Sequence, residues 1–313
     1  MEMMEYPMKQ TKQILQKYLS YCQERFPIAG ALLYAGSLFY VSYLSGNLFI
    51  NHLPIDLSHS LLGVLVIFFV LLHLRLWDEH KDYEKDRIAH PDRMLSKGLI
   101  TLQDLRKLLY VVVFLEAGMS IYLGMYVFIW WVIIMIWSYL MAVEFYCPEF
   151  LIKRIGLYLI SHQLIVPIIV IYGLIQRVTI LNSSMEEVGL LIMLCIGCIC
   201  STITYEIARK TWSKEQEHEY ADSYTKFWGI NLTLIINQLT AFLACISFSF
   251  IYYLTPSSPL FIFTTFLLYL LFLSASIRFA TTPSKSNSKF VEMTGIIFLL
   301  GLFLNASIGF YRI

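Results

Sequence analysis

One short segment of the chain concentrates carboxylates beside an apolar run. In RLWDEHKDYEKDRIAHPDR, residues 75–93, Asp78, Asp82 and Asp86 are spaced four residues apart, and Glu79 follows the first of them. On a continuous helix, residues four apart are rotated by only about 40° and Glu79 lies about 100° away, so all four carboxylates would share one face. Like charges at this spacing destabilise a helix, so the arrangement requires compensating cations. The segment is therefore a candidate cation site.

Two kinds of cation suit this segment. Lys81, Lys85 and Arg87 would neutralise part of the charge. A divalent cation would neutralise more, and clustered oxygen ligands suit Mg²⁺, which takes one or two carboxylates together with water and phosphate oxygens. Arg93 and Lys97 follow the acids and stand where they would bind a phosphate that shares the metal. The alternative is a charged helix end that merely meets water, and the spacing alone does not choose between the two.

The elements that must position these residues are long apolar runs. Hydrophobic residues make up 58% of the 313 residues and charged residues 14%, whereas ordinary soluble domains carry about 25% charged residues. A bilayer-spanning helix needs about 20 apolar residues. We therefore predict an all-α integral membrane protein in which residues 1–313 form a single domain, a bundle of nine transmembrane helices at about 28–49, 57–77, 104–124, 126–144, 155–175, 187–208, 230–254, 258–279 and 291–311.

The basic residues indicate how these helices are oriented. With the N-terminus in the cytoplasm, 21 of the 23 Lys and Arg residues fall on the cytoplasmic side, and only Arg177 and Arg312 lie outside. Such an excess marks cytoplasmic loops. The N-terminus and the two long acidic loops, 78–100 and 206–229, are therefore predicted to be cytoplasmic. The net charge of +1 gives no indication of a nucleic-acid partner, and the sequence identifies no protein partner.

The second acidic loop follows the run 187–208. It reads TYEIARKTWSKEQEHEYADSYTKFWG and contains Glu206, Arg209 and Lys210 near its start. The carboxylates that follow are Glu215, Glu217, Glu219 and Asp222. Glu206 is either a functional carboxylate or a structural charge that Arg209 or Lys210 neutralises. The alternating carboxylates fit a solvated loop as well as a metal site.

Two polar residues inside the apolar runs each allow two interpretations, because ionisable groups at bilayer depth are costly and often functional. Glu116, in the run 104–124, is either a substrate-orienting base or a neutral carboxyl that is hydrogen-bonded between helices, and we favour the second. His162, together with Gln163 in the run 155–175, either lines an acceptor pocket or takes part in interhelical hydrogen bonds, which is the more common role.

The first acidic segment resembles the first signature of the UbiA-type superfamily of intramembrane prenyltransferases. DEHKDYEKD followed by HPDRMLSKGLIT is similar to an Asn-Asp-x-x-Asp-x-x-x-Asp run that precedes an Asn-Arg-Pro and Ser-Gly stretch. Asp82 and Asp86 match the last two aspartates, Asp78 and Glu79 stand where Asn-Asp is usual, and the order of Pro and Arg around 91–93 differs. The resemblance covers most of the chain and implies nine transmembrane helices, with acidic motifs on the cytoplasmic side after the second and the sixth.

The resemblance also implies a role for individual charged residues. It implies that Asp82, Asp86 and Glu206 are catalytic, and that Mg²⁺ is bound by carboxylates of both motifs, namely Asp78, Glu79, Asp82, Asp86, Glu206 and Glu215. Together with Arg93 and Lys97, it implies diphosphate contacts by Lys153, Arg209 and Lys210. Here the second motif departs from the usual pattern, because Glu206 takes the place of the leading aspartate and the two cations stand where the next acidic residue is expected.

An acidic metal site at the rim of an apolar bundle suits an isoprenyl diphosphate, which has an anionic head and an apolar tail. We therefore expect a Mg²⁺-dependent prenyltransferase in the lipid bilayer that ionises an isoprenyl diphosphate and transfers the prenyl group to a small or lipophilic acceptor. The alternative is a UbiA-type terpene cyclase, in which the allylic cation formed by ionisation reacts within the same prenyl chain. A cation-binding membrane carrier is a third interpretation, but carriers bind at mid-membrane and these acids lie at the rim.

Overall fold

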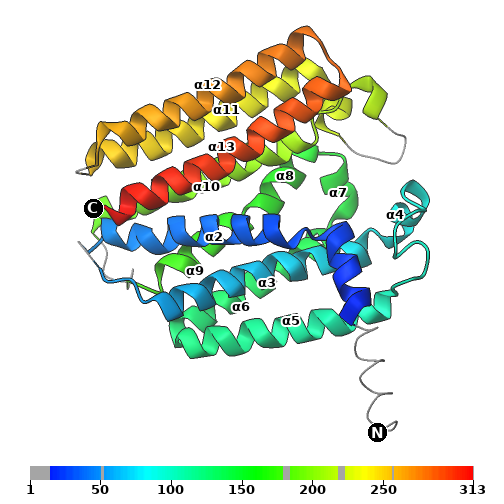
Figure 1. Cartoon of the computed structure of the whole chain (residues 1–313), viewed down its shortest axis with the longest axis horizontal. Helices are drawn as coiled ribbons and strands as arrows, with labels where there is room; N and C mark the ends of the chain where they lie inside the picture. Colours follow the sequence, from blue (N-terminus) through cyan, green and yellow to red (C-terminus); the bar gives the residue numbers. More distant parts are fainter. Residues whose placement is uncertain (1–14, 51–52, 179–183, 218–222, 256, 313) are drawn as a thin grey trace, which may run out of the picture.

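The computed structural model describes residues 15–50, 53–178, 184–217, 223–255 and 257–312. Every regular element within these ranges is helical, which confirms the all-α prediction for the described part of the chain. The long helices run side by side in one bundle, and the connections between them gather at its two ends (Figure 1).

Among the described residues, eight helical stretches are long and apolar enough to cross a membrane. They are Ile28–Leu48 (α2, Ile28–Leu44, with η1, Ser45–Leu48), Leu57–Lys81 (α3), Met125–Ala142 (α6), Ile155–Leu174 (α8, Ile155–Gln163, with α9, Ile165–Leu174), Met185–Arg209 (α10), Tyr224–Leu254 (α11), Pro259–Thr281 (α12) and Lys285–Tyr311 (α13). The chain is thus a multi-pass integral membrane protein, and eight of the nine predicted spans have a counterpart in the structure.

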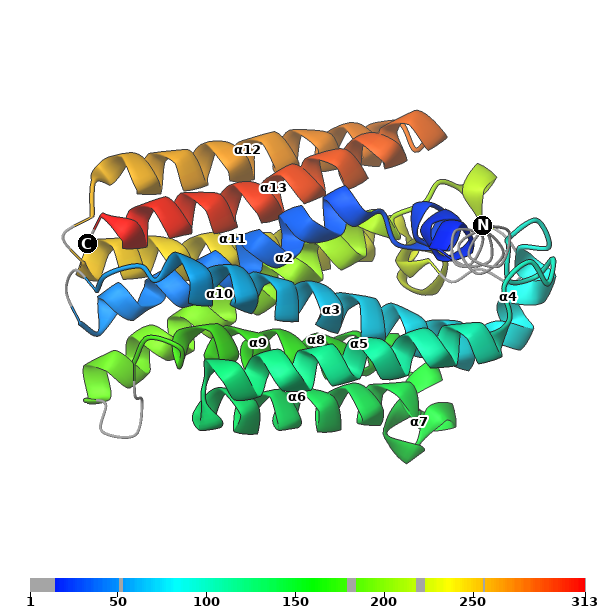
Figure 2. The same ribbon diagram turned by 60° about the horizontal axis from the view of Figure 1, so that its bottom comes forward.

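The ninth predicted span, 104–124, is helix α5 (Leu102–Leu123). It packs against both α3 and α6, and Figure 2 shows it running along them. Its first turns are charged, since they contain Asp104, Arg106 and Lys107, and Glu116 lies farther along. These charges distinguish α5 from the eight more apolar stretches, so its crossing of the membrane stays a prediction.

A buried polar network ties α5 to its two neighbours. Glu116 Oε1 lies 2.8 Å from His73 Nδ1 of α3, and Trp131 Nε1 of α6 donates to Glu116 Oε2 at 2.9 Å. The other ring nitrogen of His73 lies 3.0 Å from Ser138 Oγ. All four side chains are buried, and buried polar groups require partners. Glu116 is therefore hydrogen-bonded between helices, the interpretation favoured from the sequence.

Three breaks interrupt helices of the bundle. Asp82 (φ −95°, ψ 7°) separates α3 from the short helix α4 (Tyr83–Ala89). The predicted run 155–175 is broken at Leu164, because Pro167 lacks an N–H and its ring would clash with the carbonyl four residues earlier. In α11, Gly229 adopts φ 75°, a left-handed conformation that favours glycine.

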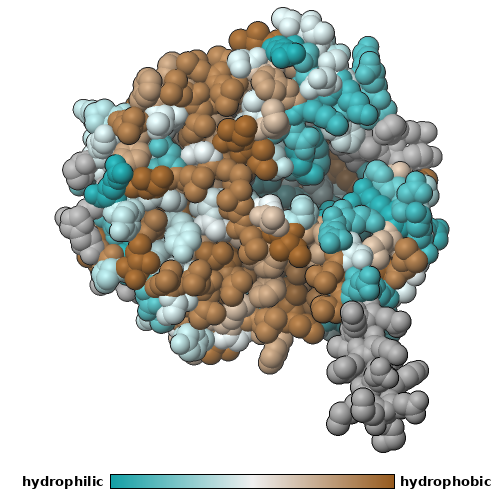
Figure 3. Space-filling view, viewed as in Figure 1, coloured by the Kyte–Doolittle hydropathy of each residue, from teal (hydrophilic) through white to brown (hydrophobic). Residues whose placement is uncertain are grey.

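Both acidic segments lie at the same end of the bundle. The helix α4, the short helix α7 (Pro148–Ile152) and the chain that leaves α10 toward η4 (Lys214–Gln216) all appear at the right of Figures 1 and 2. Hydrophilic side chains gather around a recess at this end, whereas hydrophobic side chains cover the middle of the molecule (Figure 3). Large apolar side chains such as Phe114, Ile129 and Phe263 are exposed on the helices, as a lipid-facing surface requires.

Candidate active site

Glu79 is the most deeply buried carboxylate of the first acidic segment. Its Oε1 accepts from Nε of Arg25, in the N-terminal helix (residues 15–25), at 2.7 Å and from Nη2 of Arg75 at 2.6 Å. Its side chain is 2% exposed, whereas that of Asp78 is 50% exposed. The two carboxylates therefore do not share one face, because Glu79 turns toward the N-terminal helix. A metal-binding role for Glu79 stays a prediction.

Asp86 is held by two arginines. Its Oδ2 lies 3.1 Å from Arg25 Nη2 and also pairs with Arg93 Nη1. The structure thus brings the predicted phosphate ligand Arg93 to the acidic segment. It places Lys97 differently, since this half-exposed side chain pairs with Asp92 at 3.6 Å. No pattern in the sequence points to Arg25, which joins Glu79 and Asp86 in one charge network from 54 or more residues away along the chain.

Asp78 and Asp82 are the carboxylates of this segment with the weakest pairing. The distance from Asp78 Oδ1 to Lys81 Nζ is 3.7 Å. None of the ion pairs between described residues includes Asp82. Burial raises the pKa of Asp82 above its usual range, an effect that Lys81 opposes and the neighbouring carboxylates reinforce. Within the described ranges, no three His, Cys, Asp or Glu side chains are grouped closely enough to hold a metal ion by themselves.

The second segment neutralises its leading carboxylate with the two cations that follow it. Glu206 Oε2 accepts from Arg209 Nη2 at 2.6 Å, and Glu206 Oε1 lies 3.0 Å from Lys210 Nζ. These contacts span the last turn of α10, as the spacing of three and four residues allows. The loop is then tied to the start of α11, because the N–H of Tyr224 donates to the Lys210 carbonyl at 3.1 Å. The predicted diphosphate ligands Arg209 and Lys210 are thus held beside Glu206.

The later carboxylates of the second loop lie apart from this pair. Glu215 is exposed in η4. Glu217 accepts a hydrogen bond from Ser223 Oγ at 3.4 Å. Glu219 and Asp222 lie outside the described residues. A metal-binding role for Glu215 therefore stays a prediction.

Lys81 is the centre of a polar cluster that sequence reasoning missed. Its Nζ lies 3.3 Å from Glu144 Oε1 and 3.2 Å from the hydroxyl of Tyr158 in α8. Glu144 opens the turn η2 (Glu144–Tyr146), in which three successive residues have φ between 50° and 57°. This left-handed conformation costs about 1–2 kcal/mol per residue when none is glycine. Such strain persists only where surrounding contacts hold it, and no glycine marks the turn in the sequence.

Two tyrosines connect the charged groups of both segments. Tyr158 accepts a hydrogen bond from Lys81 beside the first segment. Tyr224 lies under Lys210 of the second segment, whose Nζ is 5.8 Å from the ring centroid. Tyr224 also packs in one apolar cluster with Ile207 of α10 and with Leu159, the residue that follows Tyr158 in α8. The two segments are therefore linked through α8 and the start of α11, with these two rings along the path.

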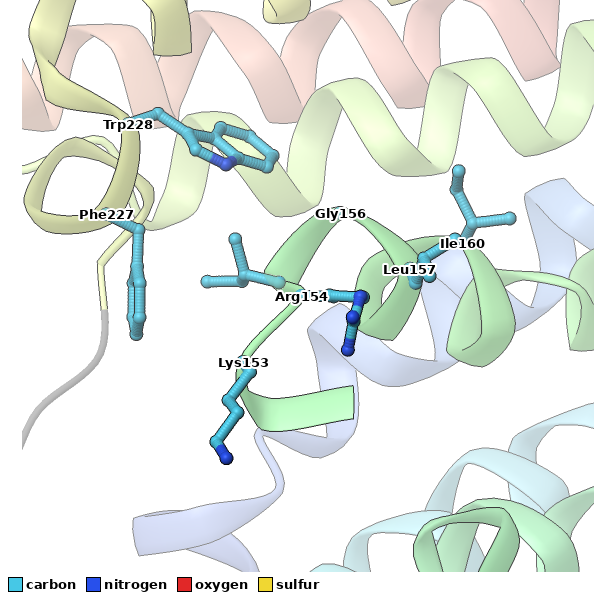
Figure 4. Close-up of a pocket in the computed structure, with 8 residues that line it drawn as sticks. Lys153, Arg154, Gly156, Leu157, Ile160, Phe227 and Trp228 are labelled. Atoms are coloured by element: carbon cyan, nitrogen blue, oxygen red, sulfur yellow. The ribbon is translucent and has the colours of Figure 1, made fainter. Parts of the chain in front are cut away.

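Lys153 lines a separate opening between the start of α8 and the start of α11. The open cavity has a volume of about 520 Å³. Figure 4 shows Lys153 and Arg154 on one side, with Phe227 and Trp228 on the other. None of the ion pairs between described residues joins Lys153 to a carboxylate of either segment. Its predicted contact with a diphosphate stays a prediction.

The fold and the site define a class of protein: a multi-pass helical bundle with carboxylates and cations collected at one end. Neither a protein-family model nor a curated protein sequence matches the chain. Solved structures do match. A digeranylgeranylglyceryl phosphate synthase is 20% identical over 95% of this chain and 100% of its own, with a TM-score of 0.66.

Two UbiA homologues are also similar in structure. One, from Aeropyrum pernix, is 12% identical over 87% of this chain and 97% of its own, with a TM-score of 0.67. The other, from Archaeoglobus fulgidus and bound to GPP and Mg²⁺, is 16% identical over 94% of this chain and 99% of its own, with a TM-score of 0.61. The chain therefore has the fold of the UbiA-type proteins, which confirms the predicted resemblance at the level of the fold.

Proposed function

We propose that the chain is a Mg²⁺-dependent intramembrane prenyltransferase of the UbiA type, with residues 1–313 acting as one domain. It ionises an isoprenyl diphosphate and transfers the prenyl group to an acceptor. One observation carries this proposal: both charged segments lie at the same end of this fold. The first contains carboxylates with few ion-pair partners, and the second contains cations that Glu206 holds in place. The A. fulgidus homologue, which has the same fold, was solved with GPP and Mg²⁺.

Asp78 and Asp82 fit a magnesium ion better than the other carboxylates. They lie one helical turn apart, Asp78 is half-exposed, and the described ion pairs leave Asp82 without a cation. Mg²⁺ typically takes one or two carboxylates and completes its shell with water and phosphate oxygens. When bound there, it would neutralise the diphosphate and stabilise it as a leaving group. Glu79 and Asp86 each contact two arginines, so in this proposal they position those cations.

The cations of both segments receive the head of the donor. Arg93 stands at the first segment, and Arg209 and Lys210 at the second. Charge-assisted hydrogen bonds from such groups to phosphate oxygens are short and strong. In this proposal Lys210 exchanges part of its contact with Glu206 for the diphosphate and so does part of the work of a second metal. Lys153 remains a further candidate for this contact.

The apolar bundle supplies the rest of the site. The prenyl tail lies among apolar side chains, and the dry surroundings keep water from the allylic cation. The ring of Tyr158 lies beside Lys81 and that of Tyr224 beside Lys210, and aromatic rings of this kind stabilise a nearby cation. We further propose that this end and the N-terminus are cytoplasmic and that α5 is the ninth span.

Product analysis tests the proposal. Purified protein in lipid nanodiscs is incubated with Mg²⁺ and geranyl, farnesyl or geranylgeranyl diphosphate, and released diphosphate is quantified. We expect release with at least one donor, and a prenylated acceptor in the mass spectrum of the extracted lipids. A product that forms without any acceptor would identify a terpene cyclase. If no donor releases diphosphate, the result would contradict both the prenyltransferase and the terpene cyclase. The cation-binding membrane carrier would then be the remaining hypothesis.

A further inference from the structure

We infer that Glu144 and His162 form the acceptor side of the site, and that this side binds a compound whose hydroxyl groups donate hydrogen bonds. The inference rests on the proposed prenyltransferase function and extends it to the chemical class of the second substrate. It depends on three polar atoms near Lys81 that are buried and have no hydrogen-bond partner among the described residues.

His162 is held in one tautomer by its own helix. Its Nδ1 lies 2.9 Å from the carbonyl oxygen of Tyr158, which can only accept, so Nδ1 carries the proton. Ser161 Oγ donates to the same carbonyl oxygen. The other nitrogen, Nε2, therefore presents a lone pair, and it is one of the buried atoms without a partner. A buried acceptor of this kind requires a donor to offset its loss of water.

Glu144 supplies the second unpartnered acceptor. Its Oε1 contacts Lys81 Nζ at 3.3 Å and accepts from the Tyr158 hydroxyl at 3.4 Å. Its Oε2 is buried and has no partner among the described residues. A carboxylate that pairs with a lysine offers only acceptors. The left-handed turn at Glu144–Tyr146 holds this side chain at the site at a cost in backbone strain.

Both acceptors border the same tyrosine. The Tyr158 ring stacks on His162, with centroids 4.0 Å apart and an interplanar angle of 17°. The hydroxyl of the same residue contacts Glu144 and Lys81. Trp77, whose donor Nε1 is the third unpartnered atom, is the residue one turn before Lys81 on the same face of α3.

Two acceptors and one donor match a hydroxyl compound. A hydroxyl group donates to an acceptor and accepts from an N–H, so it satisfies both kinds of atom. A compound that can only accept hydrogen bonds, such as an ether, would leave Glu144 Oε2 and His162 Nε2 without a donor. A carboxylate placed against Glu144 would add repulsion between like charges. The cluster lies next to Asp78 through Lys81, so a bound hydroxyl compound would lie beside the donor's head.

The test compares hydroxyl compounds with their methyl ethers. Prenyl transfer and diphosphate release are measured in the same Mg²⁺-containing reactions with resorcinol, hydroquinone and hexadecylglycerol, each beside its O-methylated form. For the wild type we expect at least one hydroxyl compound to have a KM at least about 10-fold below that of its ether. The site would have no preference for hydroxyl donors if every ether bound as well as its parent, and this would overturn the inference.

Substitutions test whether His162 and Glu144 cause the preference for hydroxyl compounds over ethers. His162→Ala and Glu144→Gln should each raise the KM of that hydroxyl compound by at least about 10-fold, with a much smaller change in the KM of the prenyl diphosphate. His59→Ala, at the start of α3 at the opposite end, and Glu149→Gln, exposed in α7, are matched controls that should leave both KM values unchanged. Unchanged acceptor KM in folded His162 and Glu144 variants would overturn the inference.

The two failures are distinguishable. If the wild type releases diphosphate but shows no hydroxyl preference, only the acceptor inference fails. If it releases none with any donor, the proposed function fails as well. Should either variant not fold, His162→Gln and the wild-type comparison of hydroxyl compounds with ethers still decide the question.

Discussion

The two charged segments at the end of the bundle neutralise their carboxylates in different ways. In the first, Asp78 is half-exposed and Asp82 takes part in none of the described ion pairs. In the second, Glu206 is paired with both Arg209 and Lys210. The first segment therefore has negative charge available for a metal ion, and the second holds positive charge that an anion can use. In the proposed function the two segments thereby supply partners for both halves of a metal–diphosphate complex.

The comparison also explains why the second segment departs from the pattern of the UbiA-type motif. Arg209 and Lys210 stand where the resemblance leads one to expect an acidic residue. A second carboxylate would need a further metal ion before it attracted a diphosphate. A fixed cation attracts the diphosphate directly. In the proposed function the first segment thus binds one metal ion and the second binds none.

The largest expected effect is the loss of Asp82, the carboxylate of the first segment that takes part in none of the ion pairs between described residues. Asp82→Asn should lower Mg²⁺-dependent diphosphate release at least about 100-fold, because a neutral amide binds the metal far less strongly. Glu84→Gln is the matched control, since that side chain is 75% exposed on α4. A folded Asp82 variant with wild-type release would remove the first segment from the metal site.

The second-largest effect is expected when a cation of the second segment is removed. Lys210→Ala should raise the KM of the prenyl diphosphate about 10-fold or more through the loss of a charge-assisted hydrogen bond. Lys214→Ala, exposed in η4, should leave it unchanged. If KM and turnover of the Lys210 variant equal those of the wild type, the second segment does not bind the diphosphate.

Arg25 tests whether the remaining carboxylates position cations. Arg25→Ala removes one partner from both Glu79 and Asp86 but leaves Arg75 and Arg93 in place. We expect the protein to lose about 1–3 kcal/mol of stability, measured as a lower midpoint of thermal unfolding, and to lose activity only a few-fold. Arg106→Ala, exposed on α5, serves as control. An unchanged midpoint would show that the network does not hold the N-terminal helix.

Glu215 should give the smallest effect. Its side chain is exposed in η4, so Glu215→Gln should change diphosphate release by less than about 2-fold. A loss comparable to that of Asp82→Asn, measured in the same assay, would instead place a second metal ligand on the second loop. The comparison between the two segments would then need revision.

Much of the fold follows from the apolar runs, because a membrane-spanning helix must satisfy its backbone internally and present apolar side chains to lipid. The sequence therefore predicts the eight apolar spans well. It predicts less about breaks, which depend on single residues. The interruption at Leu164 arises from Pro167, whereas the one at Asp82 has no proline or glycine to mark it.

The ion pairs of the candidate site could not be predicted from the spacing of residues in the sequence. Helical periodicity groups Asp78, Asp82 and Asp86, but it does not reveal that Arg25 packs against Glu79. The position of Glu144 at the site could not be predicted for another reason. Its left-handed backbone is imposed by tertiary contacts, and the local residues show no preference for it.

The most direct test of the account is the metal dependence of diphosphate release by the wild-type protein. The sample is chelated stringently with EDTA, assayed with its best prenyl diphosphate, and assayed again after Mg²⁺ is added. The account predicts that release is abolished by chelation and restored by Mg²⁺, and that Mg²⁺ does not restore it in Asp82→Asn. Wild-type release that persists in the chelated sample would contradict the central claim.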